Sequence, residues 1–451
     1  MRIGRTMGVF ACIAILATAC GGSTATTQPT AKPATAGPAT AAPVTAAPAS
    51  HAATAAPASQ TATTAPATAT TGPHSQPPSP NGGTIAPLPS GVPTSIGPGE
   101  GQVTVLNWPG YVEDGTVDPA YDWITPFETQ TGCQVTYQDF GTSDEAFGLF
   151  TTNPDKYDVI SASGDASLRL VRAGFVQPVN VDLIDSYKDI YSTLKDRPYN
   201  TVDGVHYGVP HGRGSNLLMW RTDTITPAPT SWAQMFAADS GYKVSVYDAP
   251  IYIADAAVVL MSTQPDLGIT NPYALDATQF AAAVALVQQE RPNITDFWTD
   301  YTKQMDAFRS GDANVGTTWQ IITNLLQGET PPVPVDVIKP VEGATGWSDT
   351  WMINSKAQHI NCAYMLVNWL TSAPVNIQIA EYFGEAPGNS KACALATDAT
   401  FCDTFHAADN DPFWNNVWYW QTPEAQCVDG RTDATCMDFG QWVDAWQQIK
   451  G

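Results

Sequence analysis

The chain has 451 residues and a formal net charge of −23, with 20 Lys and Arg against 43 Asp and Glu. Such an acidic surface repels nucleic acid, and no cluster of basic residues offsets it, so a nucleic-acid-binding protein is excluded. The charge favours a cationic ligand only weakly, because many exported proteins are acidic for solubility.

The first segment has the pattern of an export signal. Arg2 and Arg5 precede an apolar run over residues 7–16 that is too short to span a bilayer as a helix. The run leads into Leu16-Ala17-Thr18-Ala19-Cys20-Gly21, which resembles the lipobox of bacterial lipoproteins. This resemblance implies a lipoprotein signal peptide over 1–19 and acylation of Cys20. The alternative is a plain secretory signal with a chance Cys.

Residues 20–100 form the second segment, rich in Ala, Thr and Pro and poor in aromatic and charged side chains. Such a composition buries too little apolar surface to offset the entropy of ordering, so we expect a disordered linker. The linker would hold the folded part away from the membrane. Its Thr-rich and Pro-rich stretches are also candidates for glycosylation.

From Gly101 onward, short strands and helices alternate. Strands are expected at 103–108, 134–137, 157–161, 217–220 and 242–246. Helices are expected at 121–131, 145–151, 168–174, 252–262 and 278–290. This alternation predicts an α/β protein with parallel sheets. A body of about 350 residues is too large for one core, so we expect two lobes with a ligand cleft between them.

Eight cysteines are present, of which Cys12 lies in the signal and Cys20 in the lipobox. Six remain, and an even number in an exported protein indicates disulfides. Six cysteines allow 15 pairings, so spacing alone leaves the choice open. The pairing we prefer closes two short polar loops and leaves one long-range bridge: Cys393–Cys402, Cys427–Cys436 and Cys133–Cys362.

Motifs for catalysis, metals and cofactors are absent. There is no H-E-x-x-H, no P-loop, no G-x-S-x-G and no G-x-G-x-x-G after a strand. His206 and His211 lie in a Pro/Gly turn at a spacing poorly suited to a metal pair. The many carboxylates leave a glycosidase pair open by number alone, but no feature singles out two of them. We therefore expect no catalytic residue, no metal and no cofactor.

Six short motifs follow one another along residues 101–451. They are Asn107-Trp108-Pro109-Gly110-Tyr111-Val112; Tyr157-Asp158-Val159-Ile160 with Ser163 and Ala173-Gly174-Phe175-Val176-Gln177; Tyr207-Gly208-Val209-Pro210 with Gly214; Thr230-Ser231-Trp232-Ala233-Gln234-Met235-Phe236; Val315-Gly316-Thr317-Thr318-Trp319; and Pro340 with Glu342-Gly343-Ala344-Thr345-Gly346-Trp347-Ser348-Asp349. In this order and spacing they resemble the spermidine/putrescine-binding proteins of ABC importers.

The resemblance implies a two-lobed periplasmic-binding-protein-like fold of type II. Lobe 1 would comprise 101–213 and 347–392, and lobe 2 would comprise 214–346 and 393–451. The chain would cross between the lobes near 212–215, 346–348 and 392, and these crossings would form the hinge.

The resemblance also implies a ligand site made of aromatic walls and carboxylates. Aromatic faces attract a cation and cover its methylene groups, and a carboxylate forms a charge-assisted hydrogen bond with an ammonium group. The implied residues are Trp108 and Tyr111 in lobe 1, Trp319 and Asp248 in lobe 2, Trp347 and Asp349 at the crossing, and Ser163 as an added hydroxyl.

Four positions differ from the family pattern. Asp165 and Glu385 stand where the family has Tyr, Ile251 replaces a second carboxylate after Asp248, and Arg213 occupies a position that is usually aromatic. The expected site then holds four acids against one Arg, which favours a multiply charged cation. Arg213 would either neutralise a neighbouring acid or clamp a ligand carboxylate, and the second role would indicate a zwitterion.

We therefore expect a non-catalytic, extracytoplasmic binding module of an ABC uptake system, anchored by lipid at Cys20. Its lobes would close on a small cationic amine such as spermidine or putrescine, and the closed form, a monomer, would dock on a membrane permease. One alternative is the same fold with another solute: a zwitterion, an amino acid, a sugar or a compatible solute. The other is a secreted hydrolase, which would need a nucleophile or an acid–base pair in the cleft.

Overall fold

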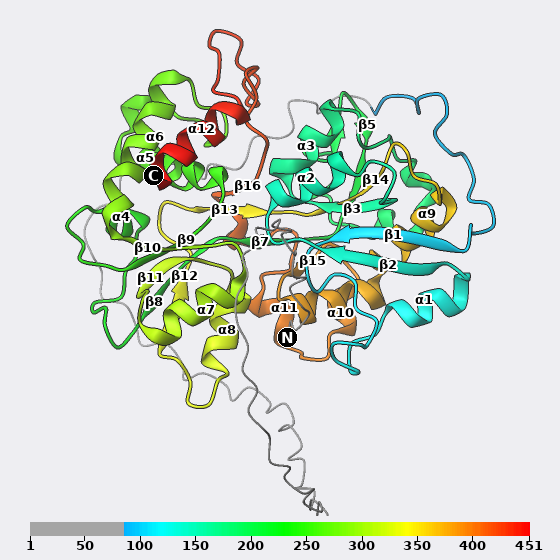
Figure 1. Ribbon diagram of the computed structural model, residues 1–451, viewed down its shortest axis with the longest axis horizontal. Helices are drawn as coiled ribbons and strands as arrows, with labels where there is room; N and C mark the ends of the chain where they lie inside the picture. The colour runs from blue at the N-terminus through cyan, green and yellow to red at the C-terminus, as the bar shows by residue number, and fades with distance from the viewer. Residues whose placement is uncertain (1–84) are drawn as a thin grey trace, which may run out of the picture. The chain divides into compact units, whose positions relative to one another are not determined.

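The structure, a computed structural model, describes residues 85–451. These residues form two α/β lobes on either side of a small central sheet (Figure 1), as the alternation of strands and helices predicted. The expected signal peptide, the Cys20 lipobox and the linker up to residue 84 lie outside the described residues.

The last part of the expected linker runs along lobe 1. The Gly97 amide donates to Asn361 Oδ1 at 2.7 Å, and Asn180 Nδ2 donates to the Pro93 carbonyl at 3.0 Å. Hydrogen bonds therefore attach residues 93 and 97 to lobe 1. The folded part begins earlier in the chain than Gly101, where the change in composition had placed the end of the linker.

Lobe 1 contains a five-stranded sheet. In spatial order its strands are β2 (Gln134–Asp139), β1 (Gln102–Asn107), β3 (Val159–Ala162), β14 (Thr350–Ile353) and β6 (Gly208–Pro210). The first three are parallel, and β14 runs antiparallel to both of its neighbours. Val103, Val105 and Leu106 of β1 are fully buried, because helices cover both faces of a central parallel strand.

The helices of lobe 1 lie on both sides of this sheet, with α2 (Ser143–Thr152) and α3 (Gly164–Arg172) above it in Figure 1 and α1 (Ile124–Thr131) and α10 (Ala373–Phe383) below. Thr142 caps α2 by accepting the Glu145 amide. The remaining elements of the lobe are α9 (Ile360–Leu370), α11 (Phe401–Thr404), β4 (Thr201–Val202) and β5 (Val205–His206).

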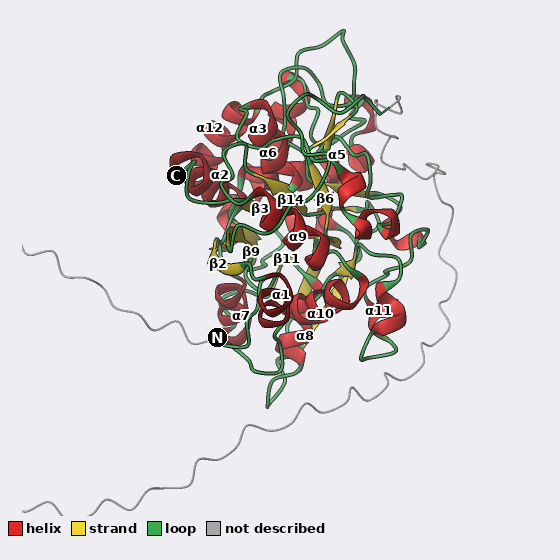
Figure 2. Ribbon diagram, turned by 90° about the vertical axis from the view of Figure 1, so that its right-hand side faces the viewer, coloured by secondary structure: helices red, strands yellow, loops and turns green. Residues whose placement is uncertain are grey.

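Lobe 2 repeats this design around a second five-stranded sheet. In spatial order its strands are β10 (Ile294–Trp298), β9 (Val244–Tyr247), β11 (Val315–Thr318), β8 (Leu217–Arg221) and β12 (Val335–Ile338). Its helices are α4 (Trp232–Phe236), α5 (Ile253–Thr263), α6 (Ala277–Glu290), α7 (Tyr301–Ser310), α8 (Gln320–Gln327) and α12 (Phe439–Lys450). Figure 2 shows the strands between layers of helices. Each lobe has its own large cluster of buried apolar side chains, as the length argument requires.

A four-stranded sheet joins the lobes, and we call it the hinge sheet. In spatial order it consists of β15 (Ala386–Pro387), β7 (Gly212–Ser215), β13 (Ala344–Trp347) and β16 (Val417–Tyr419). β7 and β13 lie at the two crossings expected near 212–215 and 346–348.

The third crossing differs in place from the one expected near residue 392. Short 3-10 helices occur at η1 (Val181–Leu183), η2 (Asp185–Asp189), η3 (Pro250–Tyr252), η4 (Pro265–Leu267), η5 (Arg291–Asn293), η6 (Ala392–Leu395) and η7 (Pro412–Trp414). Ala392 of η6 and Phe401 of α11 pack against Ile377 and Ala380 of α10, so this stretch belongs with lobe 1. At the third crossing, the chain therefore enters lobe 2 only after it has passed through β16.

The six cysteines form Cys133–Cys362, Cys393–Cys402 and Cys427–Cys436, which is the pairing preferred from the sequence. The first bridge joins residues 229 apart within lobe 1, whereas the other two each close a separation of nine. Across residues 85–451, no helix has both the length and the apolar character that a membrane crossing requires.

Replacing Cys133 and Cys362 together by Ser is expected to destabilise the protein more than replacing Cys393 and Cys402. Closing a loop of 229 residues restricts the unfolded chain by about 5 kcal/mol, against about 2–3 kcal/mol for a separation of nine. Denaturant unfolding of the two double variants measures the difference. Equal loss in both would contradict the loop-entropy account.

Candidate functional site

The candidate residues gather where the strands of both lobes end at the hinge sheet. Trp108 follows β1, Ser163 follows β3 and Trp319 follows β11. In α/β proteins the carboxyl ends of parallel strands are the usual place for a ligand, because the connecting loops there carry side chains into one crevice.

Two carboxylates, Asp349 and Glu385, form the centre of the site, and we call them the hinge carboxylates. The hydroxyl of Tyr111 lies 2.9 Å from Asp349 Oδ2 and 3.1 Å from Glu385 Oε2, and its single proton can serve only one of them at a time. Ser163 Oγ donates to Asp349 Oδ1 at 2.6 Å, and Trp347 Nε1 donates to Glu385 Oε2 at 3.2 Å.

The hinge carboxylates are deeply buried, with Asp349 2 % and Glu385 1 % exposed. Neither forms an ion pair with a Lys or Arg of the described chain. Burial raises the pKa of Asp349 to about 6, against the lowering effect of its hydrogen bonds from Ser163 and Tyr111. Burial, helped by the charge of Asp349, raises the pKa of Glu385 well above its usual value.

Among residues 85–451, His211 is the one basic side chain that lies within 4 Å of the hinge carboxylates, and burial keeps it neutral. Burial lowers its pKa to about 3, and its Nδ1 accepts a hydrogen bond from Trp351 Nε1 at 2.9 Å, which leaves the ring proton on Nε2. That nitrogen lies 3.3 Å from Glu385 Oε1, but the two atoms are not aligned for a hydrogen bond. Glu385 therefore retains an oxygen without a hydrogen-bond partner among the described residues.

Aromatic rings from both lobes surround the hinge carboxylates. The ring of Trp319 lies 5.3 Å from that of Trp347 and 6.4 Å from that of Trp108, so the walls expected from lobe 1, lobe 2 and the crossing meet. Gly214 makes room for Trp347, since a Cβ at this position would lie 2.0 Å from the indole.

Three further rings extend this wall, and the sequence alone did not identify them. Tyr247 stacks on Trp420 at 5.8 Å and contacts Trp298 at 5.0 Å. The indole nitrogens of Trp298 and Trp420 are buried and have no hydrogen-bond partner within residues 85–451. The signal for Tyr247 was available, because it directly precedes the singled-out Asp248 at the end of a buried strand.

Asp165 is a third buried acid, in the first turn of α3 and 2 % exposed. Ser143 Oγ donates to its carboxylate at 2.9 Å, yet burial still raises its pKa to about 7. The charges of Asp165 and Asp349 both raise the pKa of Tyr247, which burial raises first. Asp165 therefore lies beside the same aromatic wall as the hinge carboxylates.

Arg213 does not join this group. The neighbours Gly212 and Gly214 present their Cα hydrogens to Glu385 and Trp347, and Arg213 lies between them in β7 with its side chain on the opposite face. There its Nη2 donates to the Ala408 carbonyl at 2.7 Å, and its guanidinium lies 4.2 Å from the Trp414 ring centre.

Asp248 also has a different partner from the one that the resemblance implies. Lys450 Nζ of α12 lies 2.6 Å from its carboxylate, and Trp446 Nε1 donates to it at 2.9 Å. The negative charge of Asp248 is thus neutralised within lobe 2. Of the four acids expected in the site, the structure brings together Asp165, Asp349 and Glu385.

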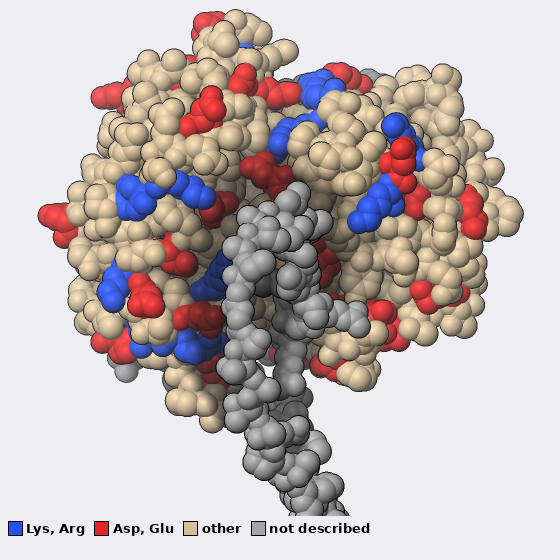
Figure 3. All heavy atoms as spheres, in the orientation of Figure 1, with Lys and Arg blue, Asp and Glu red and all other residues tan. Residues whose placement is uncertain are grey.

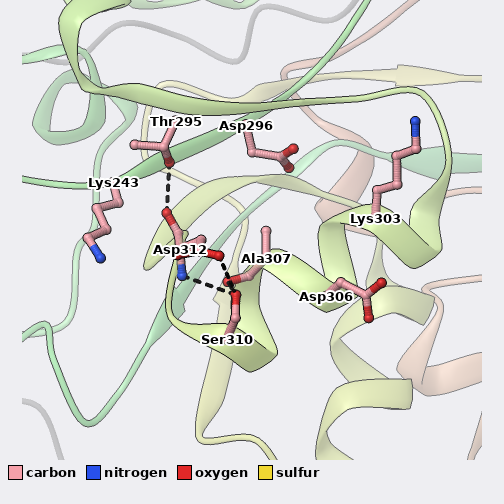
Figure 4. A pocket seen from close by; sticks show the side chains of 8 residues that line it. All are labelled: Lys243, Thr295, Asp296, Lys303, Asp306, Ala307, Ser310 and Asp312. Carbon is pink, nitrogen blue, oxygen red and sulfur yellow. Dashed lines mark hydrogen bonds between the residues drawn. The ribbon is translucent and has the colours of Figure 1, made fainter.

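A wide hollow of about 670 Å³ lies on lobe 2, apart from the hinge carboxylates (Figure 4). Its charges are mixed, and Ser310 and Thr295 donate hydrogen bonds to the carboxylate and carbonyl of Asp312. Lysines and aspartates line it together, in contrast with the hinge carboxylates, which have no Lys or Arg partner among the described residues. The hollow is lined by Lys243, Thr295, Asp296, Lys303, Asp306, Ala307, Ser310 and Asp312.

The charges elsewhere are dispersed. Figure 3 shows acidic side chains over both lobes, with basic ones mostly beside them. In the part of the chain that the structure describes, no group of three or more His, Cys, Asp or Glu is arranged to hold a metal ion.

Residues 122–404 match the family model described as "Bacterial extracellular solute-binding protein". The spermidine/putrescine-binding periplasmic protein of Escherichia coli is 23 % identical over 314 residues, which cover 69 % of this chain and 84 % of that protein. The structure of the spermidine/putrescine ABC transporter substrate-binding protein PotD from Streptococcus pneumoniae aligns with a TM-score of 0.59 at 16 % identity, over 77 % of this chain and 98 % of that one.

The binding protein MotA of Agrobacterium tumefaciens, solved with glucopine, aligns with a TM-score of 0.59 at 17 % identity, over 78 % of this chain and 100 % of that one. These alignments confirm the expected two-lobed fold and show that proteins of this fold hold different solutes. The family model matches more than half of this chain. The chain therefore belongs to the bacterial extracellular solute-binding proteins, a family of binding proteins and not of enzymes.

Proposed function

We propose that the chain captures a small cationic amine, such as spermidine or putrescine, for an ABC uptake system. The observation that carries this proposal is the pair of hinge carboxylates, buried between the lobes with no Lys or Arg partner in the described chain. Two such groups cannot both be ionised without a compensating positive charge. An ammonium group supplies that charge together with hydrogen-bond donors for the free oxygen of Glu385.

The aromatic wall supports the same class of ligand. The faces of Trp108, Trp319 and Trp347 attract a cation by about 0.5–2 kcal/mol each and cover the methylene groups of an alkylamine. Asp165 adds a second negative position near the same wall. A ligand with positive charges separated by apolar carbons suits this alternation of acids and rings.

The zwitterionic alternative loses support, because the Arg213 side chain lies on the other face of β7 from Glu385, where its Nη2 bonds the Ala408 carbonyl and its guanidinium packs on Trp414. The binding of another solute by the same fold is the alternative that the experiments below must distinguish from the binding of a cationic amine. The function of the carboxylates in this proposal is to hold the ligand, in keeping with a family of binding proteins.

The proposal places the protein outside the cytoplasm, held by lipid on Cys20 and by a linker that separates the lobes from the membrane. Two acyl chains on one cysteine suffice for stable anchoring, whereas one gives only reversible binding. The lobes close by rotation about the hinge sheet, and the closed monomer docks on the permease.

The first prediction concerns the hinge carboxylates. Asp349→Asn and Glu385→Gln should each weaken the binding of the preferred polyamine by about 10-fold to 100-fold, because each removes a charge-assisted hydrogen bond. Titration calorimetry with spermidine, putrescine, amino acids and sugars measures this. Asp182→Asn, an exposed acid of lobe 1, is the matched control.

Asp248→Asn belongs in the same series. Lys450 already neutralises Asp248, so this variant should keep its affinity within about 2-fold while losing some stability. Wild-type protein that binds a sugar or an amino acid, and no polyamine below millimolar concentration, would overturn the proposal. Loss of affinity only in Asp248→Asn would shift the site to lobe 2.

The second prediction concerns pH. In the ligand-free protein the pKa is about 6 for Asp349 and about 7 for Asp165, and a bound cation lowers both. Binding below pH 7 must therefore release protons, so affinity should rise from pH 5 to pH 8 and weaken as pH falls through these values. Calorimetry at pH 6.5 in two buffers of different ionisation enthalpy counts the protons. Proton uptake, or affinity independent of pH, would contradict the assignment.

The third prediction concerns Cys20. In a bacterial host that processes lipoproteins, Cys20→Ser should release the protein from the membrane fraction, whereas Cys12→Ser should leave it attached. Mass spectrometry of the mature N-terminus should show a diacylated Cys20. An unmodified cysteine in a membrane-free protein would indicate the plain secretory signal instead.

A further inference from the structure

A second unpaired carboxylate lies in lobe 1, on Glu113. Its side chain belongs to a residue only 3 % exposed, and its Oε2 is buried without a hydrogen-bond partner within the described residues. Burial raises the pKa of Glu113 to about 7, and the charges of Asp139, Asp114 and Asp118 act in the same direction. We call these four acids the rim cluster.

Nothing in the described chain neutralises the rim cluster. None of the ion pairs within residues 85–451 involves one of its four carboxylates. The only side-chain hydrogen bond to Asp139 comes from Asn107 Nδ2, at 2.9 Å, and Asn107 Oδ1 itself is buried without a partner. Glu113 Oε2 and Asn107 Oδ1 are thus the two buried oxygens here that lack a partner among the described residues.

The charge of Glu113 reaches one tyrosine from each lobe, Tyr382 and Tyr301. Tyr382, at the end of α10, packs 4.6 Å from the ring of Tyr121, and its pKa is raised to about 12 by burial and by Glu113. Tyr301 opens α7 of lobe 2, and the charge of Glu113 raises its pKa as well, after burial. The lobes are in contact here, since a Cβ on Gly141 would lie 2.9 Å from the Thr299 carbonyl.

The strand order relates this cluster to the hinge carboxylates. Asp139 ends β2, Trp108 follows β1 and Ser163, which bonds Asp349, follows β3. These three strands are neighbours in the order β2-β1-β3, so Asp139 lies two strand spacings, about 10 Å, from Ser163 along one edge of the sheet. Trp108 lies between the two acidic positions.

We propose that Glu113 and Asp139 form a second ammonium subsite, which makes the protein selective for long polyamines over short diamines. The spacing suits such a ligand, because nine bonds place the end nitrogens of extended spermidine about 11 Å apart, whereas the five of putrescine give about 6 Å. An ammonium ion fits better than a metal, since no three His, Cys, Asp or Glu of the described residues converge as metal ligands. Carboxylates with tyrosine side chains nearby suit an alkylammonium group, which carries a positive charge on an apolar chain.

This inference rests on the proposed function, and one experiment separates the two. Calorimetry compares spermidine and putrescine binding to wild type, Glu113→Gln and Asp139→Asn, with Asp182→Asn as the control for loss of one lobe 1 charge. Both rim variants should weaken spermidine binding by at least 10-fold and change putrescine binding by less than 3-fold. Thermal unfolding checks that each variant is folded. If Glu113→Gln does not fold, the comparison of the two ligands with Asp139→Asn alone tests the subsite.

Equal effects on both ligands, or none on either, would overturn the subsite and leave the proposed function standing. Wild-type protein that binds neither polyamine would overturn the proposed function and the subsite with it. Restoring the charge by Glu113→Asp should recover part of the spermidine affinity, which a merely structural role of the side chain would not predict.

Discussion

Asp349 and Glu385 are buried between two lobes, share the single proton of the Tyr111 hydroxyl, and have no Lys or Arg partner in the described chain. Folding alone does not favour this arrangement, because each ionised carboxylate loses its hydration and gains only neutral donors. The raised pKa values of both acids express that cost. In the function we propose, the surrounding architecture holds this uncompensated charge in place until a cationic ligand binds.

The hinge sheet is what brings the parts together. Asp349 lies in the turn from β13 to β14, where the chain crosses between the lobes, and Glu385 immediately precedes β15, the edge strand of the hinge sheet. Trp108 and Ser163 enter from lobe 1, and Trp319 enters from lobe 2. The rings of Trp108 and Trp319 lie 6.4 Å apart across the two lobes, so a ligand that contacts both would stabilise this arrangement of the lobes.

Two other charged side chains near the cleft, Asp248 and Arg213, have partners within the protein. Lys450 neutralises Asp248, and Trp414 and the Ala408 carbonyl hold Arg213 on the far face of β7. Both partners come from segments beyond residue 392, which the sequence had assigned entirely to lobe 2. The C-terminal stretch thus shapes the charge of the site, and it also supplies Trp420 to the aromatic wall.

Local patterns in the sequence determined a large part of this description. The strands near 103–108 and 134–137 and the two lobes followed from hydrophobic runs and chain length, because these depend on composition and on neighbouring residues. Loop lengths gave only a preference among the cysteine pairings, and Trp108, Ser163 and Asp349 were named by resemblance to a known family. Local patterns did not predict three other features of the site. These are the direction of the Arg213 side chain, the pairing of Asp248 with Lys450, and the presence of the Tyr247 and Trp420 rings in the aromatic wall. Those depend on which face of a strand a side chain takes and on contacts between residues about 200 apart, as between Asp248 and Lys450, and only the tertiary structure decides such contacts.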